Sequence, residues 1–455
     1  MRRHAIIGRF GPLDVCPVPV AANEVSTPLD LVAPDGRLDY GIGQALDDAV
    51  DLNVFPTEIG LDLLVLAAHV QAADTRISRT TESQDTWTRE IRLVVPVSDP
   101  VRWTSAASLL KRTLDFLTGD LWTVGFRARP EPFGRIVAPR QQDLAATPYD
   151  ALALFSGGLD SLIGAIDVLE AGKRALLVSH AADGATSGAQ NDCFAGLESH
   201  YGSANMGRLR VWMSFPEGLV ADVQSENTTR GRSFLFFALG IFAGTGLGHR
   251  FTLRVPENGL IAVNVPLDPL RLGSSSTRTT HPFYIGRWNE ILDHLGIPAR
   301  VENPYWNMTK GEMAAACSNQ QLLRALVPGS LSCAAATKGR WQGRGIEHCG
   351  YCLPCLIRRA ALVRAWGAGN DLTAYAIPDL AAQTLDTRRA QGEQVRSFQF
   401  AIARLRAHPG IEKILIHKPG RLTDVQDHLD DLAGVYRRGL EEVGSLVANV
   451  QTKPL

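Results

Sequence analysis

The chain has 455 residues, of which 45% are hydrophobic, 7% aromatic and 20% charged, and its formal net charge is −1. These proportions are typical of a globular protein of two to four domains, and a net charge near zero leaves nucleic-acid binding possible without indicating it. The N-terminus lacks the apolar segment of a signal peptide, and no run of about 18 uncharged apolar residues occurs, so we expect a cytoplasmic protein without membrane contact.

Residues 1–129 predict an N-terminal α+β domain, which we expect to recruit a partner or substrate. Apolar residues recur at helical spacing near 55–74 and alternate as in a half-buried strand near 87–97. A second helix is expected over 105–117 and a second strand over 120–129. The following segment, 130–148, contains four prolines and no regular period, which predicts a linker.

Residues 149–329 predict a doubly wound parallel sheet, because short apolar stretches alternate with helical ones. Strands are expected over 151–155, 174–180 and 208–215, and helices over 159–171 and 189–200. The segment 233–248 is apolar nearly all round. It is too short and too rich in glycine for a membrane span, so we expect a helix buried against the sheet.

A glycine-rich turn lies between the first of these strands and the first helix, in "LALFSGGLDSLIGAI". A helix that begins at a sheet edge presents free amide groups and a positive dipole end, which together bind anions. Gly157 and Gly158 would let the backbone approach the anion, and Ser156 and Ser161 would add hydroxyl donors. Asp160 beside an anion indicates an intervening Mg²⁺. A plain Gly-Gly turn with a serine cap is the alternative.

Polar residues near 257–283 predict a second binding region. Glu257 and Asn258 follow a strand ending in "FTLRVP", at the carboxyl edge where ligands of such sheets bind. A run of donors before Pro282 suits a carboxylate or phosphate. The run consists of Arg278, Thr279, Thr280 and His281. The alternative is an ordinary polar loop.

Four of the seven cysteines crowd into the segment 330–365. They are Cys333, Cys349, Cys352 and Cys355, and the last three form two C-x-x-C steps that share Cys352. In a reducing compartment this spacing predicts a structural Zn²⁺ with four thiolate ligands and no open position for catalysis. The other three cysteines are scattered and are expected to be small buried residues.

The chain after the cysteines is expected to be helical. Arg358, Arg359 and Arg364 follow the cysteines on one helix, which we interpret as a solvated face rather than a nucleic-acid site. Residues 366–455 predict a helical C-terminal extension with an apolar stripe near 422–443. We expect this stripe to pack on the core of the same chain, with packing on another chain as the alternative.

The turn resembles a known ATP-binding motif. Residues Ser156–Ser161 match all six positions of the S-G-G-x-D-S pyrophosphate loop, or PP-loop, found in the adenine nucleotide alpha hydrolase-like enzymes that adenylate carboxylates, ureas or carbonyl oxygens. The resemblance implies that Ser156, Gly157, Gly158, Leu159, Asp160 and Ser161 bind the pyrophosphate half of ATP. It further implies that the end of the second strand, Val178, Ser179 and His180, lies beside the adenine.

Together with the cysteine motif, the loop is similar to the QueC family, the 7-cyano-7-deazaguanine synthases. The likeness rests on S-x-S-C at 330–333 and C-G-x-C-x-x-C-x-x-R at 349–358, and more loosely on Arg232 and on "TKGE" at 309–312. It covers about residues 150–365. The family adenylates 7-carboxy-7-deazaguanine with ATP, lets ammonia displace AMP, and can activate the amide again to make the nitrile. The matched positions imply that Asp160, Ser161, Arg232 and Lys310 are catalytic.

The sequence departs from the family where substrate is recognised. Its usual tyrosine-glycine-glutamine signature is replaced by a longer segment with Gln190 as a possible equivalent, and residues 255–283 replace its substrate loop. "ENGLIAVN", "STRTTHP" and the N-terminal unit are similar to the QueC-like proteins of bacterial anti-phage operons, the QatC family of the Qat system among them. That likeness implies a protein partner from the same operon, whose amine could accept the activated deazaguanine carboxylate.

Two other functions stay open. The first is modification of a tRNA base, which for sulfur transfer would need a reactive cysteine outside the zinc site, and only Cys193 and Cys317 lie in the catalytic domain. The second is a nucleotide-sensing scaffold without catalysis. The intact Asp160 and both loop serines favour an enzyme over such a scaffold.

Overall fold

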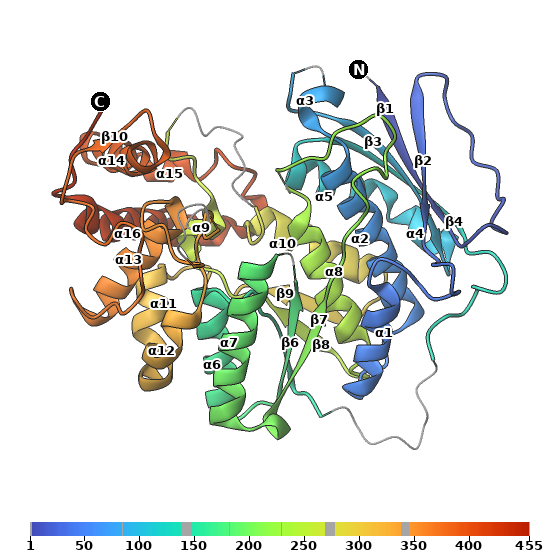
Figure 1. Cartoon of the computed structure of the whole chain (residues 1–455), viewed down its shortest axis with the longest axis horizontal. Coiled ribbons are helices and arrows are strands. Elements are labelled where there is room, and N and C mark those ends of the chain that lie inside the picture. Colours follow the sequence, from blue (N-terminus) through green and yellow to red (C-terminus); the bar gives the residue numbers. More distant parts are fainter. Residues whose placement is uncertain are drawn as a thin grey trace.

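The computed structural model describes residues 2–83, 85–138, 148–181, 183–228, 230–268, 278–337 and 345–454. Residues 139–147 of the predicted linker, residues 269–277 of the second predicted binding region and residues 338–344 of the cysteine segment therefore lie outside the described residues. The described chain contains two larger parallel sheets with helices between and around them, and a helical region near the C-terminus that includes a short two-stranded parallel sheet (Figure 1).

The N-terminal sheet has the strand order β2-β1-β3-β4, and every neighbouring pair is parallel. Its strands are β1 (Arg3–Arg9), β2 (Glu24–Asp30), β3 (Glu90–Val97) and β4 (Leu121–Ala128). The expected α+β arrangement is therefore wrong, because all strand pairs are parallel and helices form the crossovers from β2 to β3 and from β3 to β4, as in an α/β unit. The helices are α1 (Ile42–Asp51), α2 (Glu58–Arg76), α3 (Arg79–Glu82), α4 (Pro100–Ser105) and α5 (Ala107–Thr118).

The reason for this error lies in β3. The alternation of its apolar residues predicted one buried face, but Val94 on the opposite face is also buried, in a small cluster with Ala5 and Ile7 of β1. Strands that are covered on both faces are characteristic of parallel sheets. Strand direction also depends on where the connecting helices pack, which no short stretch of sequence reveals.

The second sheet confirms the parallel α/β unit predicted from residue 149. Its strand order is β7-β6-β5-β8-β9, with all pairs parallel. The strands are β5 (Ala151–Leu154), β6 (Ala175–His180), β7 (Met206–Val211), β8 (Phe251–Arg254) and β9 (Ala299–Glu302). The chain leaves β5 toward β6 on one side and later returns to β8 on the other. This switch point at the carboxyl end of β5 is where open parallel sheets bind ligands.

Helices cover both faces of this sheet. On one face, α6 (Leu159–Glu170), α7 (Gly184–Tyr201), α11 (Lys310–Ala316) and α12 (Gln320–Leu326) share an apolar cluster with alternate strand residues such as Leu177. On the other face, α8 (Arg232–Thr245) and α10 (Pro282–His294) pack against residues such as Leu176.

The two sheets share one apolar core through α2 and α8, which pack against each other between them (Figure 1). Both helices are buried nearly all round, as predicted for the segment that forms α8. The two helices approach each other closely where Gly60 of α2 meets Thr245 at the end of α8, because a Cβ on Gly60 would collide with the Thr245 hydroxyl. Within the described part of the chain, we find no helix with the length and apolar character needed to cross a membrane.

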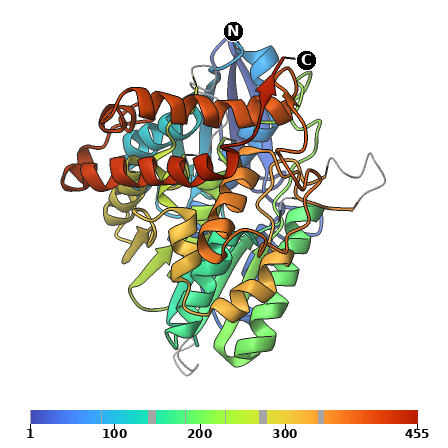
Figure 2. The same cartoon turned by 90° about the vertical axis from the view of Figure 1, so that its left-hand side faces the viewer.

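The C-terminal helices form a second core. Figure 2 shows α14 (Ala390–Ala407) and α16 (Leu429–Val447) lying side by side, and they pack with α13 (Leu353–Trp366) and α9 (Gly259–Val263). The predicted apolar stripe faces inward, because Leu432, Tyr436 and Leu440 are fully buried in this core. The expectation that the stripe packs on its own chain is confirmed. The remaining elements are α15 (Glu412–Leu415), β10 (Leu385–Asp386) and β11 (Thr452–Lys453).

Candidate functional site

The glycine-rich turn connects β5 to α6 at the switch point of the second sheet. Gly157 has a φ of +76°, and a Cβ there would lie 2.7 Å from the backbone nitrogen of Gln190, so both the conformation and the space require glycine. Gly158 is the N-cap residue of α6. The first amides of α6 lack intrahelical partners, which gives this end of the helix its capacity for an anion.

The two serines of the turn contact each other across it. The Ser156 hydroxyl accepts a hydrogen bond from the Gly158 amide at 3.3 Å and lies 3.2 Å from the Ser161 hydroxyl, which donates to the Gly158 carbonyl at 3.0 Å. Ser156 lines the cavity described below, whereas Ser161 is buried behind it. Ser161 therefore supports the turn.

Asp160 is the charged residue of the turn, and its carboxylate binds two partners from other elements. The Lys310 ammonium lies 3.1 Å from one oxygen, and the Asn258 side-chain amide donates to the other at 2.8 Å. Only 12% of the Asp160 side chain and 8% of the Lys310 side chain are exposed. The pair is therefore largely shielded from water, which strengthens the attraction between the two charges.

Local capping places both partners. Thr309 is the N-cap of α11 and forms a capping box with Glu312, so Lys310 becomes the first residue of that helix. Asn258 is the N-cap of α9, where its side-chain oxygen accepts from the Ile261 amide at 3.2 Å. Its remaining amide group is thereby directed to Asp160.

Glu257 is a second carboxylate in the same region. The Thr280 hydroxyl donates a hydrogen bond to one of its oxygens. Burial raises the pKa of Glu257 to about 7, with the nearby negative charge of Asp160 acting in the same direction against the hydrogen bond from Thr280. Near neutral pH, Glu257 is therefore partly protonated, whereas an ordinary glutamate is ionised.

Arg232 begins α8 and contributes a positive charge. Its guanidinium lies 5.5 Å from the ring centroid of Phe236, and no described carboxylate lies within ion-pair distance of it. Burial lowers the pKa of Arg232, and the nearby Asp183 opposes this shift. The preceding residue, Gly231, donates its amide to Asp74 of α2 at 2.6 Å, so the N-terminal unit holds the start of α8.

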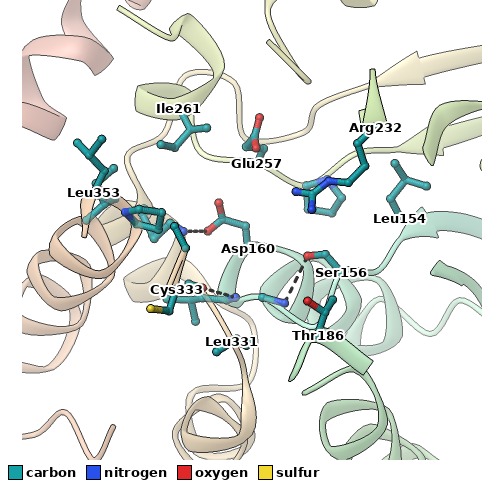
Figure 3. A pocket seen from close by; sticks show the side chains of 18 of the residues that line it. Leu154, Ser156, Asp160, Thr186, Arg232, Glu257, Ile261, Leu331, Cys333 and Leu353 are labelled. Carbon is teal, nitrogen blue, oxygen red and sulfur yellow. Dashed lines mark hydrogen bonds and ion pairs between the residues drawn. The ribbon is translucent and has the colours of Figure 1, made fainter. Parts of the chain in front are cut away.

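These residues surround a cavity of about 850 Å³. The end of β6 forms one wall: the Ser179 hydroxyl donates to the Phe155 carbonyl at 2.6 Å, and burial lowers the pKa of His180 to about 4, so its imidazole is neutral. The predicted site residues that line the cavity are Ser156, Gly158, Leu159, Asp160, Val178, Ser179, His180, Arg232, Glu257, Lys310, Cys333 and Cys352. Figure 3 shows Asp160, Glu257 and Arg232 around a shared space.

The donors at 278–281 are placed outside the cavity wall. Arg278 donates to the Phe116 carbonyl and lies over the Phe116 ring, while His281 caps α10 by accepting from the Phe283 amide at 3.2 Å. Burial lowers the pKa of His281 to about 3. Thr280 contacts the cavity only through its hydrogen bond to Glu257. Thr279, Asn258 and Gly157 are not among the described lining residues.

The four predicted metal ligands converge. Their sulfur atoms all lie within 4.8 Å of one another, a cluster that could hold a metal ion. The Cys333 and Cys352 sulfurs are 3.9 Å apart, as are those of Cys349 and Cys355. A tetrahedron with Zn–S bonds of about 2.3 Å has edges of about 3.8 Å, so the spacing suits zinc. Backbone amides donate to the Cys333 and Cys349 sulfurs at 3.3 Å.

The cysteine segment also contacts the glycine turn directly. The Leu331 amide donates to the Gly157 carbonyl at 2.8 Å, and the Ser332 hydroxyl accepts from the Leu159 amide at 3.2 Å. The Ser332 amide in turn donates to a ring nitrogen of His348 at 3.2 Å. The segment that carries Cys333 therefore stabilises the turn through hydrogen bonds.

The prediction that the three arginines after the cysteines form a solvated face is only partly correct, because Arg364 is half-exposed whereas Arg358 is buried. Arg358 is fully buried and donates to the Ser330 hydroxyl at 2.9 Å and to the Val327 carbonyl at 2.7 Å. Arg364 pairs with Glu442 of α16 at 3.0 Å, and Arg359 donates to the carbonyls of 350 and 377. These arginines therefore connect loops and helices of the same chain.

Several lining residues were not predicted. Gln394 and Phe398 come from α14 in the C-terminal extension, and Asp183 and Thr186 come from the start of α7. An Asp183–Thr186 capping interaction was readable in the sequence, since the Asp183 side chain accepts from the Thr186 amide at 2.8 Å. No local pattern indicates that α14 reaches the cavity.

Comparisons with known proteins find no relative: no family model matches the chain, and no curated protein or solved structure is significantly similar to it.

Proposed function

We propose that this protein is an ATP-dependent ligase of the 7-cyano-7-deazaguanine synthase type, acting in the cytoplasm in anti-phage defence. It would adenylate the carboxylate of 7-carboxy-7-deazaguanine and release pyrophosphate. Ammonia would then give the amide and, after a second activation, the nitrile, or an amine of a partner protein would take the acyl group. The observation that carries the proposal is the meeting of the S-G-G-x-D-S turn, Lys310 and Arg232 around one cavity at a switch point.

The described contacts suit a nucleotide with its phosphates at the turn. The positive end of α6 would attract the leaving pyrophosphate, and Lys310 and Arg232 would offset negative charge that develops on the phosphates. Lys310 already lies 3.1 Å from Asp160, at the wall of the cavity. Val178, Ser179 and His180 would lie beside the adenine, where the neutral His180 adds no charge.

Asp160 would hold the Mg²⁺. A single carboxylate at a phosphate site fits this ion, which in proteins is usually bound by one or two carboxylates together with substrate phosphates. Mg²⁺ supplies charge neutralisation and orientation of the phosphates when bound. Asn258 would keep the carboxylate oriented, because its amide donates to Asp160 at 2.8 Å.

We further propose that the cysteine cluster holds Zn²⁺ in a structural role. Four thiolates fill the tetrahedral shell, so no position remains for water or substrate. The ion would stabilise the segment that donates to Gly157 and accepts from Leu159.

Sulfur transfer to a tRNA base is less well supported. Cys193 and Cys317 are both buried, and burial raises the pKa of each thiol to about 12. The thiolate is the nucleophile in such chemistry, and at neutral pH almost none of it would form at either residue.

The proposal is tested by incubating the protein with ATP, Mg²⁺ and 7-carboxy-7-deazaguanine and measuring AMP and pyrophosphate. We expect AMP to form only when the deazaguanine is present, and mass spectrometry to find the amide, the nitrile or a mass-shifted partner protein. AMP formation at the same rate without the deazaguanine would rule out a deazaguanine carboxylate as the substrate. An Asp160→Ala variant that still binds ATP and still protects cells against phage would instead favour a nucleotide-sensing scaffold.

A further inference from the structure

Part of the cavity lining, which we call the second arm, is not explained by the nucleotide. Figure 3 shows Ile261 and Leu353 on one side, Ser156, Thr186 and Arg232 on the other, and Asp160 and Glu257 between them. The second arm is bounded by α9 and the residues after it, by the start of α13 and by α14. Its described lining residues are Leu260, Ile261, Asn264, Val265, Pro266, Leu267, Leu353, Pro354, Ile357, Gln394 and Phe398.

The chemistry of this arm differs from that of the turn. None of its described lining residues carries a charge, whereas Asp160, Asp183, Arg232, Glu257 and Lys310 all line the rest of the cavity. The arm would therefore disfavour phosphates and favour an uncharged ligand with apolar faces. Phe398 is 1% exposed and belongs to the C-terminal core, so it contributes apolar wall behind the arm rather than a free ring face.

Gln394 gives the arm a specific polar group. Among the described residues its side-chain amide has no hydrogen-bond partner, although it lines the cavity. A free amide with one acceptor and two donors can pair with the edge of a heterocycle that presents both kinds of group. A few placed polar groups within an apolar wall are the usual means by which a pocket selects its ligand.

We propose that this arm binds the ring system of the carboxylate substrate, an uncharged planar heterocycle, with Gln394 on its polar edge. The inference rests on the proposed function. The substrate carboxylate must reach the α-phosphate of a nucleotide whose pyrophosphate lies at the turn. The ring must therefore extend away from the turn, past Asp160 and Glu257, and the second arm is the described part of the cavity in that direction.

The inference is tested by substrate-dependent ATP–pyrophosphate exchange, which reports adenylation without any acceptor. In Gln394→Leu we expect the KM for 7-carboxy-7-deazaguanine to rise roughly tenfold, the effect of one lost hydrogen bond to the ring, while the KM for ATP stays unchanged. If the unaltered protein shows no exchange with this substrate, the proposed function fails. If it exchanges normally and Gln394→Leu keeps the same KM, the arm does not bind the ring.

Matched variants separate recognition from folding. Gln391→Leu makes the same change one turn earlier on α14, at a residue outside the described lining, and Phe400→Ala removes a ring that is 45% exposed on the same helix. Both should leave exchange unchanged. In Gln394→Leu, a rise in the KM for ATP equal to that for the deazaguanine would contradict the assignment.

A ring without the carboxylate provides a second readout. 7-Deazaguanine should inhibit exchange competitively against 7-carboxy-7-deazaguanine and not against ATP, and Gln394→Leu should weaken this inhibition by the same factor as it raises the KM. Competition against ATP would place the ring in the nucleotide arm and overturn the inference.

Discussion

The Lys310 ammonium and the Asp160 carboxylate lie 3.1 Å apart, at the first turns of two different helices, α11 and α6. Each side chain is mostly buried, so the loss of one leaves the other without its main counter-charge. We expect Lys310→Met to reduce AMP formation at least roughly 100-fold, because a charge that would stabilise the phosphates is lost. Steady-state AMP release would measure the loss of activity, and urea unfolding would measure the loss of stability caused by the unpaired charge.

A surface lysine provides the control for this variant. Lys413 pairs with Asp430 at 2.8 Å, but the two side chains are 64% and 87% exposed. Exposed pairs contribute little, so Lys413→Met should change neither activity nor stability measurably. Equal activity in both variants would show that Lys310 has no part in the reaction.

Gly157 should tolerate no side chain. In Gly157→Ala the left-handed backbone costs about 1–2 kcal/mol, and the new Cβ would also meet the Gln190 backbone, so we expect ATP binding to be lost. Gly172→Ala is the matched control, because Gly172 has a φ of +71° with no atom within 4 Å of the added Cβ. It should cost only the backbone strain. Isothermal titration with ATP and thermal unfolding distinguish the two, and ATP affinity that survives Gly157→Ala would contradict the role of the turn.

Removal of the metal should weaken ATP binding, because residues 331 and 332 of the cysteine segment form hydrogen bonds to the turn. We expect about one equivalent of zinc per chain by elemental analysis and its loss in Cys352→Ser. Because two hydrogen bonds join the cysteine segment to the turn, ATP affinity should fall roughly tenfold in the metal-free protein. Cys16→Ser, at an exposed cysteine, should retain the metal. Full zinc content in Cys352→Ser would contradict the assignment of this ligand.

His69 on α2 should make the protein sensitive to acid. Burial lowers its pKa from 6.5 to about 4, so the unfolded chain binds more protons than the folded one between these values, and stability falls as the pH drops through this window. The single residue contributes about 3 kcal/mol to the loss. His69→Gln should reduce the difference in unfolding free energy between pH 7 and pH 4 by that order, whereas His200→Gln at an exposed position should not. An unchanged pH dependence in His69→Gln would mean that folding does not lower the pKa of His69.

Short-range patterns determined part of this protein. Three features each reflect a local requirement on the backbone. The glycines between β5 and α6 allow a left-handed turn, the spacing of the four cysteines brings their thiols together, and the apolar stripe of α16 gives one buried helix face. The parallel second sheet was predictable for a similar reason, because strand and helix alternate regularly there. Each of these features appears in the structure where the sequence placed it.

Tertiary packing decided the rest. The direction of the N-terminal strands depends on where the crossover helices pack, and the burial of Arg358 depends on loops that fold over it. The same holds for the cavity, where Lys310 meets Asp160 and α14 supplies Gln394, while Arg278 and His281 turn to other partners. Such contacts join residues far apart in the chain. Their free energy depends on the whole packing arrangement, and no local spacing encodes them.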